Sequence, residues 1–190
     1  FVLNDAAGNS SATFTTAISQ NADSIDANNP AISAVSIPNS AMKVGDAVTV
    51  TITAGETGLT MNSGSVNGVT VTSFTHNSDN TYSATYTIVD GGTDRTAGAT
   101  IPVSFVLNDA AGNSSATYST AISQNADSID ANVPTLSSVA IPNTAMNVGD
   151  AVTVTITAGE TGLTMNSGSV NGVTVTSFTD NSDNTYSATY

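Results

Sequence analysis

The feature that most constrains this chain is an internal repeat with a period of 104 residues. Residues 1–86 align with residues 105–190 without a gap, and 76 of the 86 aligned positions are identical. A unit of this length matches one small domain and is much longer than a solenoid repeat. The sequence therefore predicts tandem copies of one domain. Residues 1–28 end a preceding copy, residues 29–132 form a complete copy and residues 133–190 begin a following one, in what we interpret as an excerpt from a longer array.

Within one copy, apolar residues alternate with threonine and serine in several short runs. The clearest runs are residues 48–54, 82–88 and 101–107. Alternation with a period of two residues is typical of a β-strand with one buried face and one solvent face. Val35 and Ile37 predict an earlier strand that ends near Pro38, and residues 116–122 predict the strand that closes the unit.

The turn signals between these runs also favour antiparallel strands. Asn67 and Gly68 form a dipeptide typical of hairpins, and the alternation changes phase after Val71, which predicts a bulge. No window has helical periodicity of useful length. About seven short strands in roughly 100 residues favour an all-β fold, an immunoglobulin-like Greek-key β-sandwich. The cysteine pair and tryptophan of antibody domains are absent, since the chain contains neither residue.

The charge balance limits the partners that the chain can bind. The net charge is −13, from 15 acidic residues against two basic ones, Lys43 and Arg95. Nucleic acids and anionic membranes are disfavoured as partners, because both are recognised through basic patches. Disorder is disfavoured because 39% of the residues are hydrophobic and they alternate regularly. The absence of cysteine excludes disulfides and thiolate metal sites.

The junctions between copies are acidic. Residues 125–134 repeat residues 21–30 with a single change, at Asn29. Each junction holds two aspartates three residues apart and an asparagine two residues further on: Asp23, Asp26 and Asn28 in the first, Asp127, Asp130 and Asn132 in the second. We predict that these residues bind a cation and order the linker. The alternative is an ordinary soluble linker, because Asp and Asn are common turn residues.

The topology of a sandwich should sort the remaining acids between the two ends of a domain. Successive strands run antiparallel, so alternate connections share an end. Glu56, Asp79 and Asp109 should lie at the end where the chain enters. Asp46, Asp90 and Asp94 should lie with the junction at the end where it leaves. We predict metal ligands among these acids and in the next copy, where the linker faces the counterpart of Glu56: Glu56, Asp90, Asp94, Asp109 and Glu160.

Each of these loop acids also has a structural interpretation. Glu56 could be a solvated loop acid. Asp109 and Asn113 could stabilise their own loop through side-chain to backbone hydrogen bonds. Arg95 is a competing partner for its neighbours Asp90 and Asp94.

Two further residue types are interpreted as structural. His76 is replaced by Asp180 in the following copy, which indicates a surface position. Tyr82 and Tyr86 alternate with polar residues in a predicted strand, and we interpret them as core residues in preference to a platform for stacking sugars.

Calcium is the cation that suits the donors in these loops and junctions. Grouped carboxylates resist ionisation unless they are compensated, and two basic residues cannot compensate 15 acids. Calcium takes about six to eight oxygen ligands from carboxylates, carbonyls and water. Zinc or copper would need clusters of cysteine or histidine, and the chain has one histidine. We therefore expect Ca²⁺ as the cofactor.

Three short motifs carry a resemblance to a known family. They are the sequences Val-Gly-Asp-Ala-Val-Thr-Val-Thr-Ile at 44–52, Asn-Thr-Tyr-Ser-Ala-Thr-Tyr at 80–86 and Leu-Asn-Asp-Ala-Ala-Gly-Asn at 107–113. Together with the period and the acidic junctions, they resemble the bacterial immunoglobulin-like repeats of giant type I-secreted (RTX) adhesins. The similarity is closest to the extender regions of ice-binding adhesins of marine bacteria. The resemblance implies an extended, calcium-rigidified array on the bacterial cell surface.

The function that we predict is structural. Near-identical repeats with polar Thr and Ser faces suggest a secreted, extracellular stalk for cell adhesion that projects a distal adhesive module. Its partners would be the neighbouring repeats of the same chain, in a monomeric extended array. The alternative is a carbohydrate- or protein-binding adhesive module. An enzyme is disfavoured, because the sequence shows no catalytic triad, cysteine nucleophile or phosphate loop.

Overall fold

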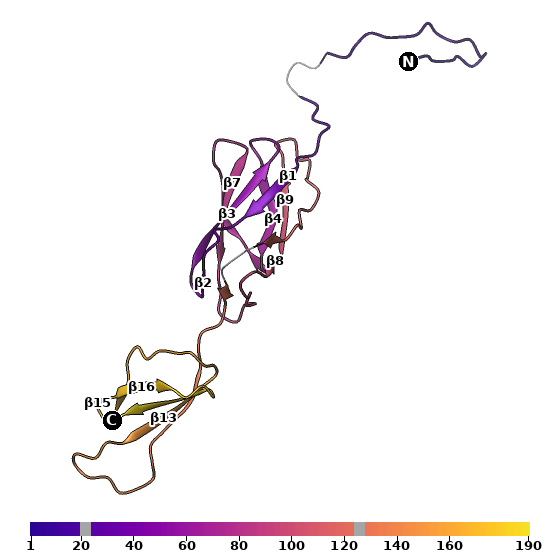
Figure 1. The fold of residues 1–190 in the computed structure, drawn as a ribbon. Coiled ribbons are helices and arrows are strands. Elements are labelled where there is room, and N and C mark those ends of the chain that lie inside the picture. The colour runs from indigo at the N-terminus through magenta and orange to yellow at the C-terminus, as the bar shows by residue number, and fades with distance from the viewer. Residues whose placement is uncertain (20–23, 124–127) are drawn as a thin grey trace.

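The chain forms β-strands and turns throughout the part described by the structure, a computed structural model covering residues 1–19, 24–123 and 128–190. No helix occurs among these residues, and so none could cross a membrane. The strands make two β domains, one from β1 to β11 and one from β12 to β17 (Figure 1). The prediction of an all-β chain with tandem domains is confirmed.

The first domain contains two main sheets. The strands of the larger sheet lie in the order β1-β3-β7-β6, and those of the smaller sheet in the order β5-β4-β9. Two short pairs, β10-β8 and β11-β2, complete the domain. The bounds of these elements are β1 (Ile32–Ser36), β2 (Met42–Lys43), β3 (Ala47–Ala54), β4 (Thr60–Val66), β5 (Val69–Thr70), β6 (Thr72–His76), β7 (Thr81–Thr87), β8 (Thr100–Ile101), β9 (Val103–Asn108), β10 (Ile122–Ser123) and β11 (Ile129–Asp130).

The two sheets share a single buried core. Val50 and Ile52 of β3, Tyr82 and Tyr86 of β7, and Phe105 of β9 are almost wholly buried. Burial alternates along β3 and β7 as the threonine alternation predicts, so that apolar side chains face inward and threonines face water. The interpretation of Tyr82 and Tyr86 as core residues is confirmed.

The predicted hairpin and bulge are both present. Asn67 and Gly68 have φ of 51° and 82°, and they join β4 to β5 through a two-residue turn in which Val66 pairs with Val69. Positive φ at both positions is the reason for the Asn-Gly signal. After Val71 the chain leaves the smaller sheet and joins the larger one as β6. Its register against β7 shifts between Thr72 and Thr75, with Ser73 at φ 55°.

Two predicted strands are wrong in extent. Residues 101–107 do not form one strand, because Pro102, which has no N–H to donate, separates β8 from β9. Residues 116–122 do not form a continuous strand either: Tyr118 makes an isolated bridge to Phe105, and only Ile122 and Ser123 pair, with β8. The sequence also failed to reveal β4, whose polar residues do not alternate and which is ordered by pairing with β5 and β9.

The second domain repeats the larger sheet and little of the smaller one. Its strands lie in the orders β12-β13-β17-β16 and β14-β15. Their bounds are β12 (Leu136–Ala140), β13 (Thr153–Ala158), β14 (Ser169–Val170), β15 (Val173–Thr174), β16 (Thr176–Asp180) and β17 (Thr185–Thr189). A smaller buried cluster, Val154, Val175 and Ala188, forms its core.

Candidate cation and linker site

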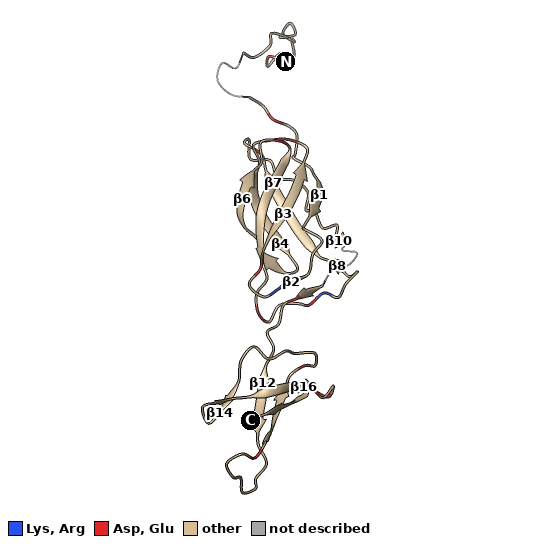
Figure 2. Cartoon of the chain, turned by 60° about the vertical axis from the view of Figure 1, so that its left-hand side comes forward, with Lys and Arg blue, Asp and Glu red and all other residues tan. Residues whose placement is uncertain are grey.

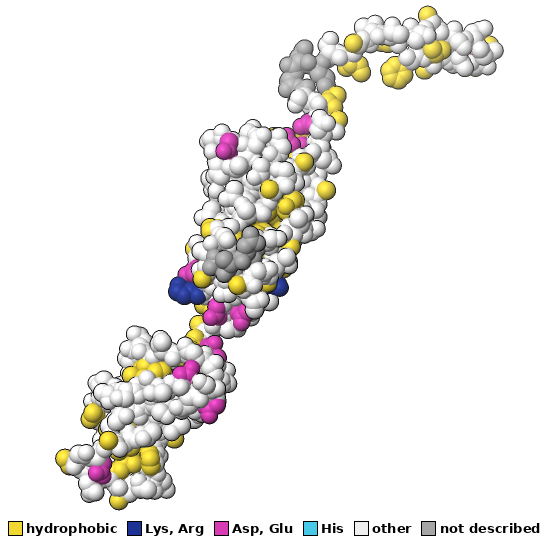
Figure 3. Space-filling view, in the orientation of Figure 1, with side chains coloured by type: hydrophobic (Ala, Val, Ile, Leu, Met, Phe, Trp, Pro, Cys, Tyr) yellow, Lys and Arg dark blue, Asp and Glu magenta, His cyan; other side chains and the backbone are white. Residues whose placement is uncertain are grey.

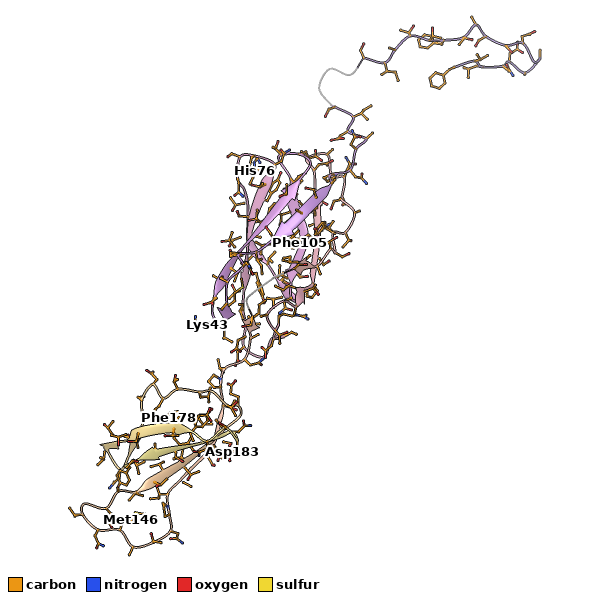
Figure 4. The ribbon with its side chains drawn as sticks, viewed as in Figure 1. Lys43, His76, Phe105, Met146, Phe178 and Asp183 are labelled. Atoms are coloured by element: carbon orange, nitrogen blue, oxygen red, sulfur yellow. The ribbon has the colours of Figure 1, made fainter. Side chains whose placement is uncertain are left out.

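The acidic residues of the first domain gather at its two ends, as predicted (Figure 2). At the entry end, the backbone N–H of Ala54 donates to the carbonyl of Asn80, and Thr60 pairs with Asn108. These contacts bring together the loops that follow β3, β6 and β9. At the exit end, the backbone of Ile88 donates to Asp46, and Gly92 donates to Ala131. In Figure 4 the labelled residues His76 and Lys43 mark the entry end and the exit end of the domain.

The exit junction is tied to the domain by two carboxylates. Oδ1 of Asp94 accepts hydrogen bonds from the backbone N of Ala131 (2.7 Å) and from Nδ2 of Asn132 (2.8 Å). Oδ1 of Asp90 accepts from the backbone N of Val133 at 3.0 Å. Three of the predicted ligands, Asp90, Asp94 and Asn132, are therefore brought together. The residues that leave the domain are held by its 90–94 loop.

The same junction is also held by backbone pairing. β11 runs parallel to β2, so that Ile129 lies opposite Met42 and Asp130 opposite Lys43. Ile129 also exchanges two backbone hydrogen bonds with Arg95, each 2.9 Å. Ile129 and Ala131 are buried in the core of the first domain. The segment from Ile129 to Val133 is therefore an integral part of the domain.

A buried asparagine positions the loop that carries Asp90 and Asp94. Asn67 is 6% exposed, and its Nδ2 donates to the backbone carbonyl of Thr93 at 2.7 Å. Its Oδ1 accepts from Nε of Arg95 at 2.8 Å. The sequence suggested that Arg95 could pair with Asp90 and Asp94. In the structure its Nε contacts Asn67 instead. Sequence reasoning identified Asn67 as a turn residue and missed this second role, because nothing local links it to a loop 26 residues away.

At the entry end the Asp109 loop is closed on itself. Asp109 is 8% exposed, and its two carboxylate oxygens accept from the backbone N and the Nδ2 of Asn113, both at 2.8 Å. Burial alone would raise the pKa of this carboxyl, but the hydrogen bonds from Asn113, Gly112 and Ala111 outweigh it and lower the pKa below its usual value. Asp109 and Asn113 therefore stabilise their own loop through hydrogen bonds, which was the structural alternative to metal binding.

The entry junction contacts this loop through its backbone. Nδ2 of Asn113 donates to the carbonyl of Asp26 at 3.4 Å, across 87 residues of sequence. Oδ1 of Asp26 accepts from the backbone N of Asn28 (3.0 Å), and Oδ1 of Asp130 accepts from the backbone N of Asn132 (3.2 Å). The two junctions thus share this aspartate-to-backbone hydrogen bond, one at each end of the domain.

The two glutamates share a backbone contact. The carbonyl of Glu56 accepts from the hydroxyl of Tyr82 at 3.0 Å, and the carbonyl of Glu160 accepts from Tyr186 at 2.9 Å. Glu56 is partly buried and Glu160 is exposed. The tyrosine hydroxyl thus fixes the backbone of the loop that carries each glutamate.

The donor set at the exit end suits a hard cation, although the geometry is not that of a closed site. Within residues 1–19, 24–123 and 128–190, no three Asp, Glu or His side chains are grouped closely enough to hold a metal ion. Asp90, Asp94, Asp130 and Asn132 nevertheless offer only oxygen ligands, which calcium prefers. The predicted ligands Asp23 and Asp127 lie outside the described residues.

The remaining charged and aromatic groups at the two ends have structural partners. Lys43 Nζ lies 2.7 Å from Asp46 Oδ1, and the hydrogen bonds from Lys43 lower the pKa of the Asp46 carboxyl. His76 is exposed, as expected, and its ring stacks on Tyr82 with centroids 4.9 Å apart. In the second domain Asp180 replaces it and accepts from the backbone N of Gly162 at 2.7 Å.

Comparison with known proteins gives no family. No protein-family model matches the chain, and no curated protein matches it either. The repeat, the fold and the junctions are the features of the chain that bear on its function.

Proposed function

We propose that this chain is part of an extracellular stalk, a spacer that projects an adhesive module from a bacterial cell surface. The observation that carries the proposal is the anchored exit junction. Two near-identical units are joined by a segment that hydrogen bonds to Asp90 and Asp94 and packs two residues, Ile129 and Ala131, into the domain that it leaves. A connection of this kind limits the swinging that small interfaces otherwise allow, which suits a spacer.

The proposal includes an immunoglobulin-like Greek-key topology for each unit. Its support is the strand order, with β1-β3-β7-β6 in one sheet and β5-β4-β9 in the other. The chain also crosses between the sheets at Val71, and non-sequential strands are neighbours in both. These features are typical of immunoglobulin-like sandwiches.

The proposal also includes calcium at the junction. Ca²⁺ would compensate the negative charge of Asp90 and Asp94, whose carboxylates hold the exit segment, and it would complete its shell with carbonyl oxygens and water. Low calcium in the cytosol would leave the repeats weakly structured for type I secretion, and calcium outside the cell would drive folding. The partners would be neighbouring repeats in a monomeric array, and the proposal includes no catalytic role.

An adhesive binding module is less well supported. Recognition of sugars by stacking needs exposed aromatic faces, whereas Tyr82 and Tyr86 are buried.

Small-angle scattering of a multi-repeat chain tests the spacer function. The wild type in calcium should give the largest maximum dimension. The double variant Asp90→Asn with Asp94→Asn, and separately Asp127→Asn with Asp130→Asn, should shorten it while circular dichroism shows folded sheets. Asp46→Asn is the matched control, because Asp46 lies at the same end and pairs with Lys43. Equal dimensions for all variants would reject the spacer mechanism. Equal dimensions for the wild type with chelator and with calcium would reject only the metal.

A further inference from the structure

The loop that holds the exit segment contains the single Asp-Gly dipeptide of the chain, Asp90 and Gly91. In Asp-Gly and Asn-Gly dipeptides the backbone nitrogen of the glycine can attack the side-chain carbonyl carbon of the residue before it. Glycine favours this attack because it has no Cβ to hinder the approach. The chain also has two Asn-Gly dipeptides, at residues 67–68 and 171–172. Within the first domain, the structure gives Asp90 and Asn67 opposite environments.

The carboxyl group of Asp90 lies beside the nitrogen that would attack it. Oδ1 of Asp90 accepts a hydrogen bond from the backbone N–H of Gly91 at 3.0 Å. Both residues are exposed. Gly91 has φ of 76°, and a Cβ built on it would have no neighbour within 4 Å. Figure 3 shows acidic side chains on the surface at this end of the first domain, where the chain leaves it. The loop thus holds the two reacting groups together, in contact with water.

Asn67 is held in an arrangement that opposes the same reaction. An asparagine reacts by releasing its Nδ2 as ammonia, so this atom must be free to leave. Nδ2 of Asn67 donates to the carbonyl of Thr93 at 2.7 Å, and its Oδ1 accepts from Nε of Arg95 at 2.8 Å. The residue is also buried. The folded domain should therefore protect Asn67 and leave Asp90 open to reaction.

We infer that Asp90 is a site of spontaneous isomerisation to isoaspartate in the folded protein. The backbone nitrogen of Gly91 attacks Cγ of Asp90, and a new N–Cγ bond forms. One Cγ–O bond breaks, and its oxygen leaves as water with the hydrogen of the Gly91 N–H and one proton from solvent. The product is a five-membered succinimide ring. The inference does not depend on the proposed function.

Water then opens the succinimide ring in one of two ways. Cleavage of the N–Cγ bond restores aspartate. Cleavage of the bond between the nitrogen and the main-chain carbonyl carbon of residue 90 gives isoaspartate. Either opening adds one water and returns the proton that the first step took up. Isoaspartate therefore has the mass of aspartate, but its main chain is one atom longer and its carboxylate is attached directly to Cα.

Isoaspartate at residue 90 would alter the contacts that hold the exit segment. Oδ1 of Asp90 accepts from the backbone N of Val133 at 3.0 Å, and Gly92 N donates to the carbonyl of Ala131 at 3.2 Å. A longer main chain with a displaced carboxylate should lose the first contact and shift the second. The hydrogen bond from Ala131 N to Asp94 lies beyond the altered bond and should remain. The modification would thus release the last residue of the exit segment and leave its buried part in place.

Incubation of the folded 190-residue chain at neutral pH tests the site. Isoaspartate is located by methylation with protein isoaspartyl methyltransferase, followed by peptide mass spectrometry. We expect isoaspartate at residue 90 and an intact amide at Asn67. The same chain in urea is the control, in which Asn67 should deamidate. A folded chain without isoaspartate at residue 90, over the time in which Asn67 reacts in urea, would overturn the inference.

Two further controls address the chemistry. Asp94 is an internal control, because the residue that follows it is Arg95, whose side chain hinders the attack. Asp90→Glu would require a six-membered ring, which forms far more slowly, so methylation at this position should disappear. Equal amounts of isoaspartate at residues 90 and 94, or undiminished methylation of the loop in Asp90→Glu, would contradict a reaction specific to Asp90 and Gly91.

Hydrogen exchange of the incubated chain tests the structural consequence. In molecules that contain isoaspartate, the Val133 amide should exchange about 10-fold faster, the factor expected for the loss of one hydrogen bond. The Ile129 amide donates to the carbonyl of Arg95 and should exchange at its original rate. An unchanged rate at Val133, or an equal increase at Ile129, would show that the modification does not act on the exit segment as inferred.

Discussion

The two β domains contain almost the same sequence but bury it to different extents. Residues 29–86 and 133–190 correspond one to one, and in both the larger sheet forms with the same strand order and the same bulges. Val35 is 7% exposed in the first domain, whereas its counterpart Val139 is 59% exposed in the second. Met42 is buried and Met146, labelled in Figure 4, lies on an open loop. The difference is the partner sheet, because Phe105 and Leu107 of β9 fill the first core, whereas residues 133–190 correspond to residues 29–86 and so do not include the counterpart of β9.

This comparison separates what local sequence decides from what packing decides. Strand pairing in the larger sheet, the Asn-Gly turns and the tyrosine contacts to Glu56 and Glu160 recur in both domains, so they are encoded within about 60 residues. Burial of β1, ordering of β4 and pairing of β2 depend on strands that lie later in the chain. Matched substitutions at repeat-equivalent positions should therefore have different effects in the two domains.

The largest expected effect is at the centre of the complete core. Phe105→Ala removes a fully buried ring and should lower the free energy of unfolding of the first domain by about 3–5 kcal/mol. Phe1→Ala, at the repeat counterpart of Phe105, should leave that value unchanged, because Phe1 is 87% exposed. Urea unfolding of the 190-residue chain at low concentration, followed by circular dichroism, measures both. Similar losses for the two variants would mean that residues 1–14 pack on the first domain.

Glycine 64 gives the next largest contrast. A Cβ at this position would lie 2.7 Å from Cε1 of Phe105 and 2.8 Å from Sδ of Met61, because the ring packs directly on the backbone of β4. Gly64→Ala should therefore destabilise the first domain by about 1–3 kcal/mol. At Gly168 the Cβ would meet the side chains of Val175 and Met165 next to an open cavity. Those side chains can move, so Gly168→Ala should have a smaller effect on the unfolding of the second domain.

The turn asparagines give a smaller contrast that isolates the buried contact. Asn67 and Asn171 both have positive φ, so glycine is accommodated at either position. Asn67→Gly removes the hydrogen bonds to Thr93 and Arg95 and should cost about 1–2 kcal/mol. It should also raise the hydrogen-exchange rate of the Ala131 amide, because this N–H donates to Asp94 in the loop that Asn67 positions. Asn171→Gly should change neither quantity, since Asn171 is exposed.

The sequence predicted the parts of the fold that depend on alternation and turn chemistry. β3 and β7 follow their threonine alternation, and the turn at Asn67 follows from its φ preference. β4 could not be predicted, because its polar residues are ordered by β9, a strand about 40 residues away in sequence. The clustering of Asp90 and Asp94 at the exit junction followed from the topology of the sandwich. Their role as hydrogen-bond acceptors for the backbone N–H groups of Ala131 and Val133 could not be predicted, because it depends on how Asn67 positions the loop.

The smallest expected effect concerns protonation of the two equivalent loop carboxyls. Hydrogen bonds from Asn9 lower the pKa of Asp5 below its usual value of 3.8, as those from Asn113 do for Asp109 against the opposing effect of burial. A lowered pKa in the folded state means that the stabilisation is present at neutral pH and is lost as the pH falls through that pKa. Carboxyl chemical shifts measured during an acid titration should therefore place both groups below the value for an unfolded chain. Protonation of Asp109 should weaken the packed first domain, whereas protonation of Asp5 should open only the hairpin of residues 1–14, in which Phe14 N donates to the carbonyl of Phe1. If Asp5 titrates as in an unfolded chain while Asp109 does not, the hairpin of residues 1–14 requires the packing of a complete domain to form.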